Sequence, residues 1–196
     1  MPIDYPNEGP GTQRIVLASG SPRRVQLLAL LIQDFQVVVP EVDEGRPAVP
    51  QDLLIAARRK AEAAGGEGDI VIGADTGVFL SGRHFGKPVD LAQAREFLLA
   101  LSGRWHEVYT GVCVLGPAGA GTALVSTRVK FSPLTDEEIE WYLANEEVLD
   151  KAGAYAIQGR AGAFVERIEG DFFNVMGFPL YTVYRLLRGQ GWRPGP

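Results

Sequence analysis

Short apolar runs that are typical of strands alternate with segments of helical periodicity along the whole chain, and this alternation constrains the fold most. Residues 15–18 have the pattern of a buried strand, and Pro22 suits the first turn of the helix that follows. Such alternation is typical of α/β proteins. No internal repeat or low-complexity linker divides the sequence. We therefore predict one α/β unit with a mixed sheet.

The same patterns place the other elements. Strands are expected over residues 35–39, 69–80, 107–115, 122–131 and 163–168, and helices over 22–32, 52–64, 91–101, from Thr135 onward, and 178–187. The strand over 69–80 is expected to be interrupted by its glycines and polar residues. Residues 1–13 and 189–196 are rich in Gly, Pro and polar groups, so both are expected to be flexible tails on a single domain of residues 14–188.

Charge and cysteine content exclude some classes of function. The net charge of −5 argues against a general nucleic-acid-binding protein, but it is compatible with a small phosphorylated ligand. Cys113 is the only cysteine, so it forms no internal disulfide, and its apolar neighbours indicate a buried residue. The first residues lack a secretory pattern, and no apolar run approaches the roughly 18 residues that span a bilayer. We expect a soluble, cytoplasmic protein with no membrane or nucleic-acid partner.

The stretch LASGSPRR, residues 17–24, places Arg23 and Arg24 at the start of a helix, where positive charge is unfavourable. A strand that ends in Ser19-Gly20-Ser21 before a helix presents hydroxyl and backbone N–H groups to an anion, and two guanidinium groups would add charge. The sequence therefore predicts an anion site here. A plain helix cap with two solvated arginines is the alternative.

Two acidic segments are candidates for chemistry. Asp75 follows four apolar strand residues in IVIGADTG, and a carboxylate there is costly unless it is paired, hydrogen-bonded or metal-bound. A catalytic base or metal ligand and a simple turn aspartate are both compatible with this segment. Asp43 and Glu44 follow the second strand, and paired carboxylates attract magnesium or manganese. An exposed acidic turn is the alternative there.

The small residues of DKAGAYAIQG, which begins at Asp150, suit a backbone that approaches a ligand closely. The amide of Gln158 donates and accepts, so it can read the edge of a base such as uracil. The alternative is a glycine-rich loop before a hairpin.

Three other signals are rejected. Gly86-Lys87 lies at the wrong spacing for a phosphate-binding loop, and Pro88 stands where a magnesium-binding hydroxyl is required. The run GPAGAG joins two strands and opens no helix, unlike a dinucleotide fingerprint. His84 and His106 are isolated, so we interpret them as surface or packing residues and do not expect a zinc enzyme.

Taken together, the segments resemble the Maf family of nucleoside triphosphate pyrophosphatases, also called septum-formation-inhibitor proteins. The match runs from residue 17 to about 187, and it is carried in order by ASGSPRR, VDE, RRKAEAA, GADTGV with GKPVD, LSGRWHEVYTGV, and DKAGAYAIQG with VERIEGDFFNVMGFPL.

The resemblance implies an elongated, Maf/ITPase-like mixed sheet flanked by helices, with a central cleft between two lobes, and commonly a homodimer. It implies a metal-dependent hydrolase that cuts a nucleoside triphosphate between its α- and β-phosphates. Arg23, Thr76 and Gln158 fit the positions that mark base specificity in the dTTP/UTP subfamily.

The hypothesis for the mechanism makes Asp75 the base that orients or deprotonates water. Glu44 would hold a divalent cation, Mg²⁺ or Mn²⁺, and Asp75 would share that duty. The residues expected to bind the triphosphate are Ser19, Ser21, Arg24, Lys60 and Lys87.

Two alternatives stay open. One is a non-catalytic, nucleotide-sensing regulator of cell division, and the other is a pyrophosphatase for modified purine or pyrimidine nucleotides.

Overall fold

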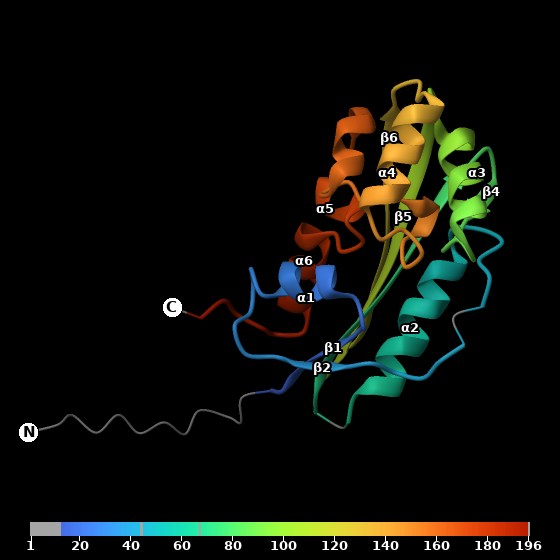
Figure 1. Cartoon of the computed structure of the whole chain (residues 1–196). Coiled ribbons are helices and arrows are strands. Elements are labelled where there is room, and N and C mark those ends of the chain that lie inside the picture. Colours follow the sequence, from blue (N-terminus) through green and yellow to red (C-terminus); the bar gives the residue numbers. More distant parts are fainter. Residues whose placement is uncertain (1–12, 44, 67, 196) are drawn as a thin grey trace, which may run out of the picture.

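The computed structural model describes residues 13–43, 45–66 and 68–195. Seven strands within these residues form one sheet, and helices cover both of its faces (Figure 1). The strands are β1 (Ile15–Ala18), β2 (Gln36–Val38), β3 (Ile70–Leu80), β4 (Arg83–Phe85), β5 (Trp105–Gly116), β6 (Gly119–Phe131) and β7 (Val165–Glu169). The helices are α1 (Pro22–Leu28), α2 (Asp52–Ala64), α3 (Leu91–Leu101), α4 (Asp136–Asn145), α5 (Phe172–Val175) and α6 (Leu180–Gly189), with 3₁₀ turns η1 (Ala152–Ala154) and η2 (Arg160–Phe164).

The sheet is mixed, as predicted. Its order is β2-β1-β3-β5-β6-β7, and β4 pairs with β3 outside this path. β1 is parallel to β2 and β3, whereas the other pairs are antiparallel. The fold is therefore an α/β sheet with a parallel end and an antiparallel end.

One edge of β3 is interrupted, and this interruption positions the site. β1 pairs with β3 only as far as Gly73, and β4 pairs with β3 only from Val78 onward. Along its other edge, β3 pairs with β5 continuously from Val71 to Phe79. Residues 74–77 therefore face a notch in the sheet, at the carboxyl end of β1, which is where open α/β sheets bind ligands.

Three apolar clusters fill the two ends of the molecule. At the parallel end, α1 and α6 pack on one face of the sheet through residues that include Leu28 and Val183, and α2 packs on the opposite face through Ala57 and Ala61. At the antiparallel end, α3 and α4 pack with residues of η1 and η2 around Phe131. The notch lies between these ends, so the predicted two-lobed arrangement is confirmed.

Helix α2 approaches the sheet closely because two glycines lie beneath it. A side chain at Gly73 would bring a Cβ within 2.1 Å of the Ala57 carbonyl oxygen, and one at Gly111 would come within 2.5 Å of Leu53 backbone atoms. Because these two positions have no side chain, the backbone of α2 can lie directly against β3 and β5. As a result, Lys60 of α2 reaches the strand at Asp75.

Most predicted elements are confirmed within a few residues, and the differences have local causes. β3 is one continuous strand, because the β5 ladder overrides the weak strand propensity of its glycines and Asp75. α1 ends at Leu28, earlier than predicted, and the chain continues in i→i+3 turns. β7 starts at Val165 and α6 at Leu180, after η2 and Pro179 respectively.

The predicted tails have different outcomes. Residues 1–12 lie outside the described residues. At the other end, the Gln190 amide bonds to Ala118 and Gly119 in the β5–β6 turn, and Trp192 packs against the core. The flexibility of residues 189–195 and the domain limits stay predictions. No helix among the described residues has the length and apolar character needed to cross a membrane.

Candidate active site

A cavity of about 680 Å³ opens at the notch in β3. Its walls come from the β1–α1 turn, α2, β3, the segment after β4, and the loop that follows α4. The predicted site residues that line it are Ser19, Ser21, Arg23, Arg24, Lys60, Asp75, Thr76, Lys87 and Gln158. Glu44 lies outside the described residues, although Gly45 and Arg46, which follow it, line the cavity.

The side chains of adjacent residues of β3 point to opposite faces of the sheet. Asp75 shares its face with Val71, which packs with α2, and its carboxylate Oδ1 accepts a 2.7 Å hydrogen bond from Nζ of Lys60. Both side chains are buried, with 12% and 7% of their surface exposed. The carboxylate that the sequence singled out is therefore paired with an ammonium group, as a buried charge requires.

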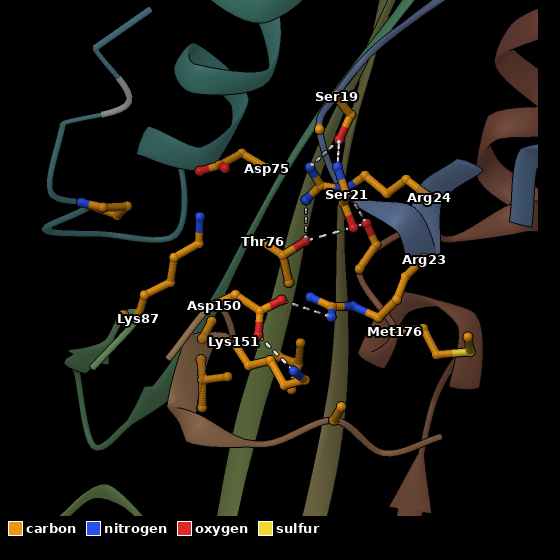
Figure 2. A pocket seen from close by; sticks show the side chains of 18 of the residues that line it. Ser19, Ser21, Arg23, Arg24, Asp75, Thr76, Lys87, Asp150, Lys151 and Met176 are labelled. Carbon is orange, nitrogen blue, oxygen red and sulfur yellow. Dashed lines mark hydrogen bonds and ion pairs between the residues drawn. The ribbon is translucent and has the colours of Figure 1, made fainter. Parts of the chain in front are cut away.

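Thr76 points to the other face, where α1 supplies Arg24. The Arg24 guanidinium donates to Thr76 Oγ1 at 3.0 Å, to Ser19 Oγ at 3.2 Å and to the Gly177 carbonyl at 2.9 Å. The Thr76 and Thr110 hydroxyl oxygens are also 3.0 Å apart. Arg24 thus joins the β1–α1 turn, β3 and the turn after α5 around the floor of the cavity (Figure 2).

Arg23 and Arg24 have different environments, although they are neighbours in sequence. Arg24 is buried, whereas the Arg23 side chain is 24% exposed and approaches Asp150 Oδ2 at 3.6 Å. Asp150 Oδ1 accepts a 2.6 Å hydrogen bond from Lys151 Nζ. Figure 2 shows Asp150 between these two cationic side chains. The alternative of two solvated arginines is therefore wrong.

Lys87 and Gln158 are the exposed members of the site. Lys87 follows β4, and Figure 2 shows its ammonium extending toward the side of the cavity that holds Asp75. Gln158 lies in the segment between η1 and η2 and lines the same cavity. Neither side chain has a hydrogen bond or ion pair within the described part of the chain, so both are available to a ligand.

The charge of the cavity is opposite to that of the whole protein. Among the described lining residues, six are lysine or arginine and two are aspartate, while the chain has a net charge of −5. Basic groups from distant parts of the sequence therefore converge on one cavity. Such an arrangement favours a ligand with several negative charges.

Sequence reasoning missed Arg46, His84, Asp150 and Lys151 as lining residues. Asp150 and Lys151 belong to the DKAGAYAIQG motif, so this motif was the signal that could have found them. His84 was interpreted as a surface or packing residue; it is half-buried, its ring lies 5.0 Å from that of Phe79, and it lines the cavity. Burial lowers the pKa of His84, although the charge of Asp75 opposes this shift.

His106 is a packing residue, as predicted. It is fully buried on β5, and its Nε2 lies 2.8 Å from the Tyr155 hydroxyl. Burial lowers the pKa of His106 to about 4. The predicted burial of Cys113 is also confirmed.

The Asp75 carboxylate offers oxygen ligands, which Mg²⁺ and Mn²⁺ prefer. No group of three or more His, Cys, Asp and Glu side chains with metal-binding geometry occurs among the residues that the structure describes. Mg²⁺ and Mn²⁺ usually take one or two carboxylates and complete their shell with substrate phosphates and water. A single carboxylate beside a cationic cavity matches that pattern.

Comparisons with known proteins test the family resemblance. The Maf-like protein family matches residues 14–190. The chain is 50% identical over 187 residues to a dTTP/UTP pyrophosphatase of Anaeromyxobacter sp., with 91% of this chain and 90% of that protein covered. It is 46% identical to those of Thermus thermophilus, with 95% of this chain and 100% of that protein covered, and of Bacillus cytotoxicus, with 90% and 95% covered.

Among solved structures, the Staphylococcus aureus Ham1 protein has a TM-score of 0.45 and 15% identity, over 61% of this chain and 72% of that chain. This likeness is too weak to support a conclusion. The family match extends over almost the whole chain, and the three relatives are similar over nearly their full lengths. The chain therefore belongs to the Maf family.

Proposed function

We propose that the protein is a nucleoside triphosphate pyrophosphatase that hydrolyses dTTP and UTP to the monophosphate and pyrophosphate. The observation that carries this proposal is the cationic cavity, lined by Asp75 among other residues, at the notch in β3. The names of the relatives, each a dTTP/UTP pyrophosphatase, support the substrate class. A triphosphate has about four negative charges at neutral pH, which the basic lining residues would compensate.

The chemistry requires a water molecule in line with the leaving pyrophosphate. Asp75 orients or deprotonates this water, which attacks the α-phosphorus, while the bond from that phosphorus to the bridging oxygen breaks. Lys60 holds one carboxylate oxygen of Asp75, so it fixes the direction of the other. Pyrophosphate leaves with the electron pair of the broken bond.

The other residues bind and orient the substrate. Lys87 would contact the phosphates directly, since it is exposed and lines the cavity. Ser19 and Ser21 add hydroxyl groups at the β1–α1 turn, and Arg24 holds that turn against Thr76. Arg23, Thr76 and Gln158 would read the base, with the Gln158 amide placed to donate to and accept from a pyrimidine edge.

A divalent cation would neutralise charge on the phosphate oxygens when it is bound. Asp75 would supply one carboxylate to it, and Glu44 remains the proposed second ligand. The choice between Mg²⁺ and Mn²⁺ is tested by assay with each metal in turn.

The decisive experiment is to incubate the protein with dTTP or UTP and either metal, and to quantify the nucleotide and phosphate products. Monophosphate and pyrophosphate in equal amounts are expected. Release of the nucleoside diphosphate and inorganic phosphate would contradict the proposed cleavage between the α- and β-phosphates. Nucleotide binding without turnover would favour the sensing regulator, and preferential turnover of modified nucleotides would favour the third alternative.

We place the activity in the cytoplasm, which supplies these triphosphates, and propose a homodimer. Light scattering after size exclusion should then give about twice the 21.2 kDa mass of the chain. A mass of one chain would contradict the dimer and leave the proposed activity unaffected.

A further inference from the structure

Asp150 is an acidic residue on the wall of a cavity whose lining is mainly basic. It lies in the loop between α4 and η1, and 55% of its side chain is exposed. A carboxylate at this position repels a polyphosphate, so Asp150 weakens substrate binding unless it also has a favourable role. Its contacts indicate what that is.

The Asp150 carboxylate bridges two cations from different parts of the chain. Oδ1 accepts from Lys151 Nζ at 2.6 Å, and Oδ2 lies 3.6 Å from NH1 of Arg23. Lys151 also donates to the carbonyl oxygen of Glu147, which anchors its ammonium to the start of the loop after α4. Burial raises the pKa of Asp150, but the hydrogen bond and charge of Lys151, with the charge of Arg23, outweigh it and lower the pKa.

Arg23 depends on this contact more than Arg24 depends on any one of its own. Arg24 donates to three acceptors on three segments. Within the described residues, Asp150 is the one group that forms an ion pair with Arg23, and Arg23 has no hydrogen bond there. An arginine side chain has many accessible rotamers, so an Arg23 without this contact would sample many positions at the cavity rim.

The contact with Asp150 orients Arg23 and leaves most of its N–H donors without an acceptor among the described residues. A bidentate pair with a carboxylate would occupy two parallel N–H groups. The single 3.6 Å approach to NH1 restrains the guanidinium and leaves its other donors for a ligand. Arg23 comes from α1 and Asp150 from the loop after α4, so the ion pair links two walls of the cavity (Figure 2).

We infer that Asp150 is a positioning residue for substrate selection, which holds Arg23 at the rim of the cavity so that its remaining N–H groups face the base. This inference rests on the proposed function. Removing the Asp150 charge should weaken selection more than turnover.

The test is Asp150→Asn, which keeps the shape and removes the charge. KM for UTP should rise about fivefold, because exposed ion pairs contribute up to about 1 kcal/mol, while kcat stays within about twofold. The ratio of kcat/KM for UTP to that for CTP should fall by a similar factor. Asp150→Glu should restore part of the loss, and Asp34→Asn, at an exposed position outside the cavity lining, should change neither parameter.

A double-mutant cycle identifies the route of the effect. In an Arg23→Ala background, Asp150→Asn should have no further effect on KM or on the UTP-to-CTP ratio. An equal effect in both backgrounds would overturn the inference, because Asp150 would then act without Arg23. A lower KM in Asp150→Asn would overturn it as well, since Asp150 would then only repel the substrate.

Failure of the proposed function has a different signature. If the wild-type protein binds UTP without turnover, the same cycle is measured as Kd by calorimetry with a non-hydrolysable α,β-methylene analogue, and non-additivity still supports the inference. If the wild-type protein neither hydrolyses nor binds UTP, both proposals fail. If it is active and the cycle is additive, this inference alone fails.

Discussion

Lys60 and Asp75 form a buried ion pair across the interface of α2 and β3, with Nζ and Oδ1 2.7 Å apart. The pair exists because Gly73 and Gly111 admit α2 close to the sheet. It places a carboxylate on the wall of a cationic cavity, and the Lys60 ammonium compensates its charge.

Replacing Asp75 with Asn should lower turnover of dTTP by at least about 10²-fold, because an amide cannot accept the proton of the attacking water. Asn keeps an oxygen that can accept from Lys60, so the hydrogen bond between α2 and β3 should be retained. Pyrophosphate release measures the effect, and calorimetric titration with the metal and nucleotide checks that both still bind. Near-normal turnover with both bound would remove Asp75 from this role.

Replacing Lys60 with Met should destabilise the protein by about 3 kcal/mol, because it leaves the Asp75 carboxylate buried without its ammonium. For a chain of this size that corresponds to a fall of about 10 °C in Tm. Arg58→Met is the matched control on the same helix, where the exposed pair with Glu62 should contribute less than about 0.5 kcal/mol. Equal unfolding midpoints for the two variants would show that the buried pair contributes nothing.

Replacing Lys87 with Ala should lower kcat by about 10²-fold if its ammonium stabilises charge in the transition state. The side chain is exposed, so Tm should not change. Steady-state kinetics separates the possibilities, and Lys87→Arg should retain part of the activity. A rise in KM alone would mean that Lys87 binds substrate and transition state equally.

Replacing Gln158 with Glu removes the donor half of the amide and adds a negative charge at the cavity wall. The carboxylate can accept from the amino group of cytosine but cannot donate to a uracil carbonyl. The preference for UTP over CTP should therefore fall by about tenfold, measured as the ratio of kcat/KM values. If the ratio of kcat/KM for UTP to that for CTP does not change, the base does not contact Gln158.

His106 should make stability depend on pH. Burial lowers its pKa from 6.5 to about 4, so between these values the unfolded chain binds a proton that the folded chain does not. Its contribution is complete above pH 6.5 and is lost as the pH falls toward 4, by up to about 3 kcal/mol. Urea unfolding at pH 7.5 and 4.5 measures this. The difference between the free energies of unfolding at the two pH values should shrink in His106→Gln. It should shrink less in His84→Gln, because burial also lowers the pKa of His84 but that ring is only half-buried.

Helix starts could be predicted from the sequence where neighbouring residues determine them. Thr135 and Glu138 form a reciprocal capping box at the start of α4, and Asp90 caps α3, because each device needs only residues three positions apart. β4 was missed because its three residues lie among turn-forming ones and pair only through the β3 register.

The site was predictable as a set of residues but not as a set of contacts. A family resemblance identifies Arg23, Arg24 and Asp75, yet nothing in the adjacent arginines indicates that one is buried against Gly177 while the other approaches Asp150. That difference arises from where α1 sits against the turn after α5 and the loop after α4, positions set by the tertiary packing of residues more than a hundred apart in sequence.

The strands β3 and β5 run without a break from one apolar cluster into the other: Ile72 and Val114 pack at the parallel end, and Val78 and Val108 at the antiparallel end. A hinge between the parallel and antiparallel ends would have to bend both of these paired strands. The sheet around the cavity is therefore expected to keep its shape when a ligand binds. Any tightening around the nucleotide falls to the exposed parts of the loops that line the cavity, at residues 45–46, at Asp150 and at Gln158, because residues 153–157 are buried. Changes of substrate range can accordingly accumulate in those loops without disturbing the scaffold that carries Asp75.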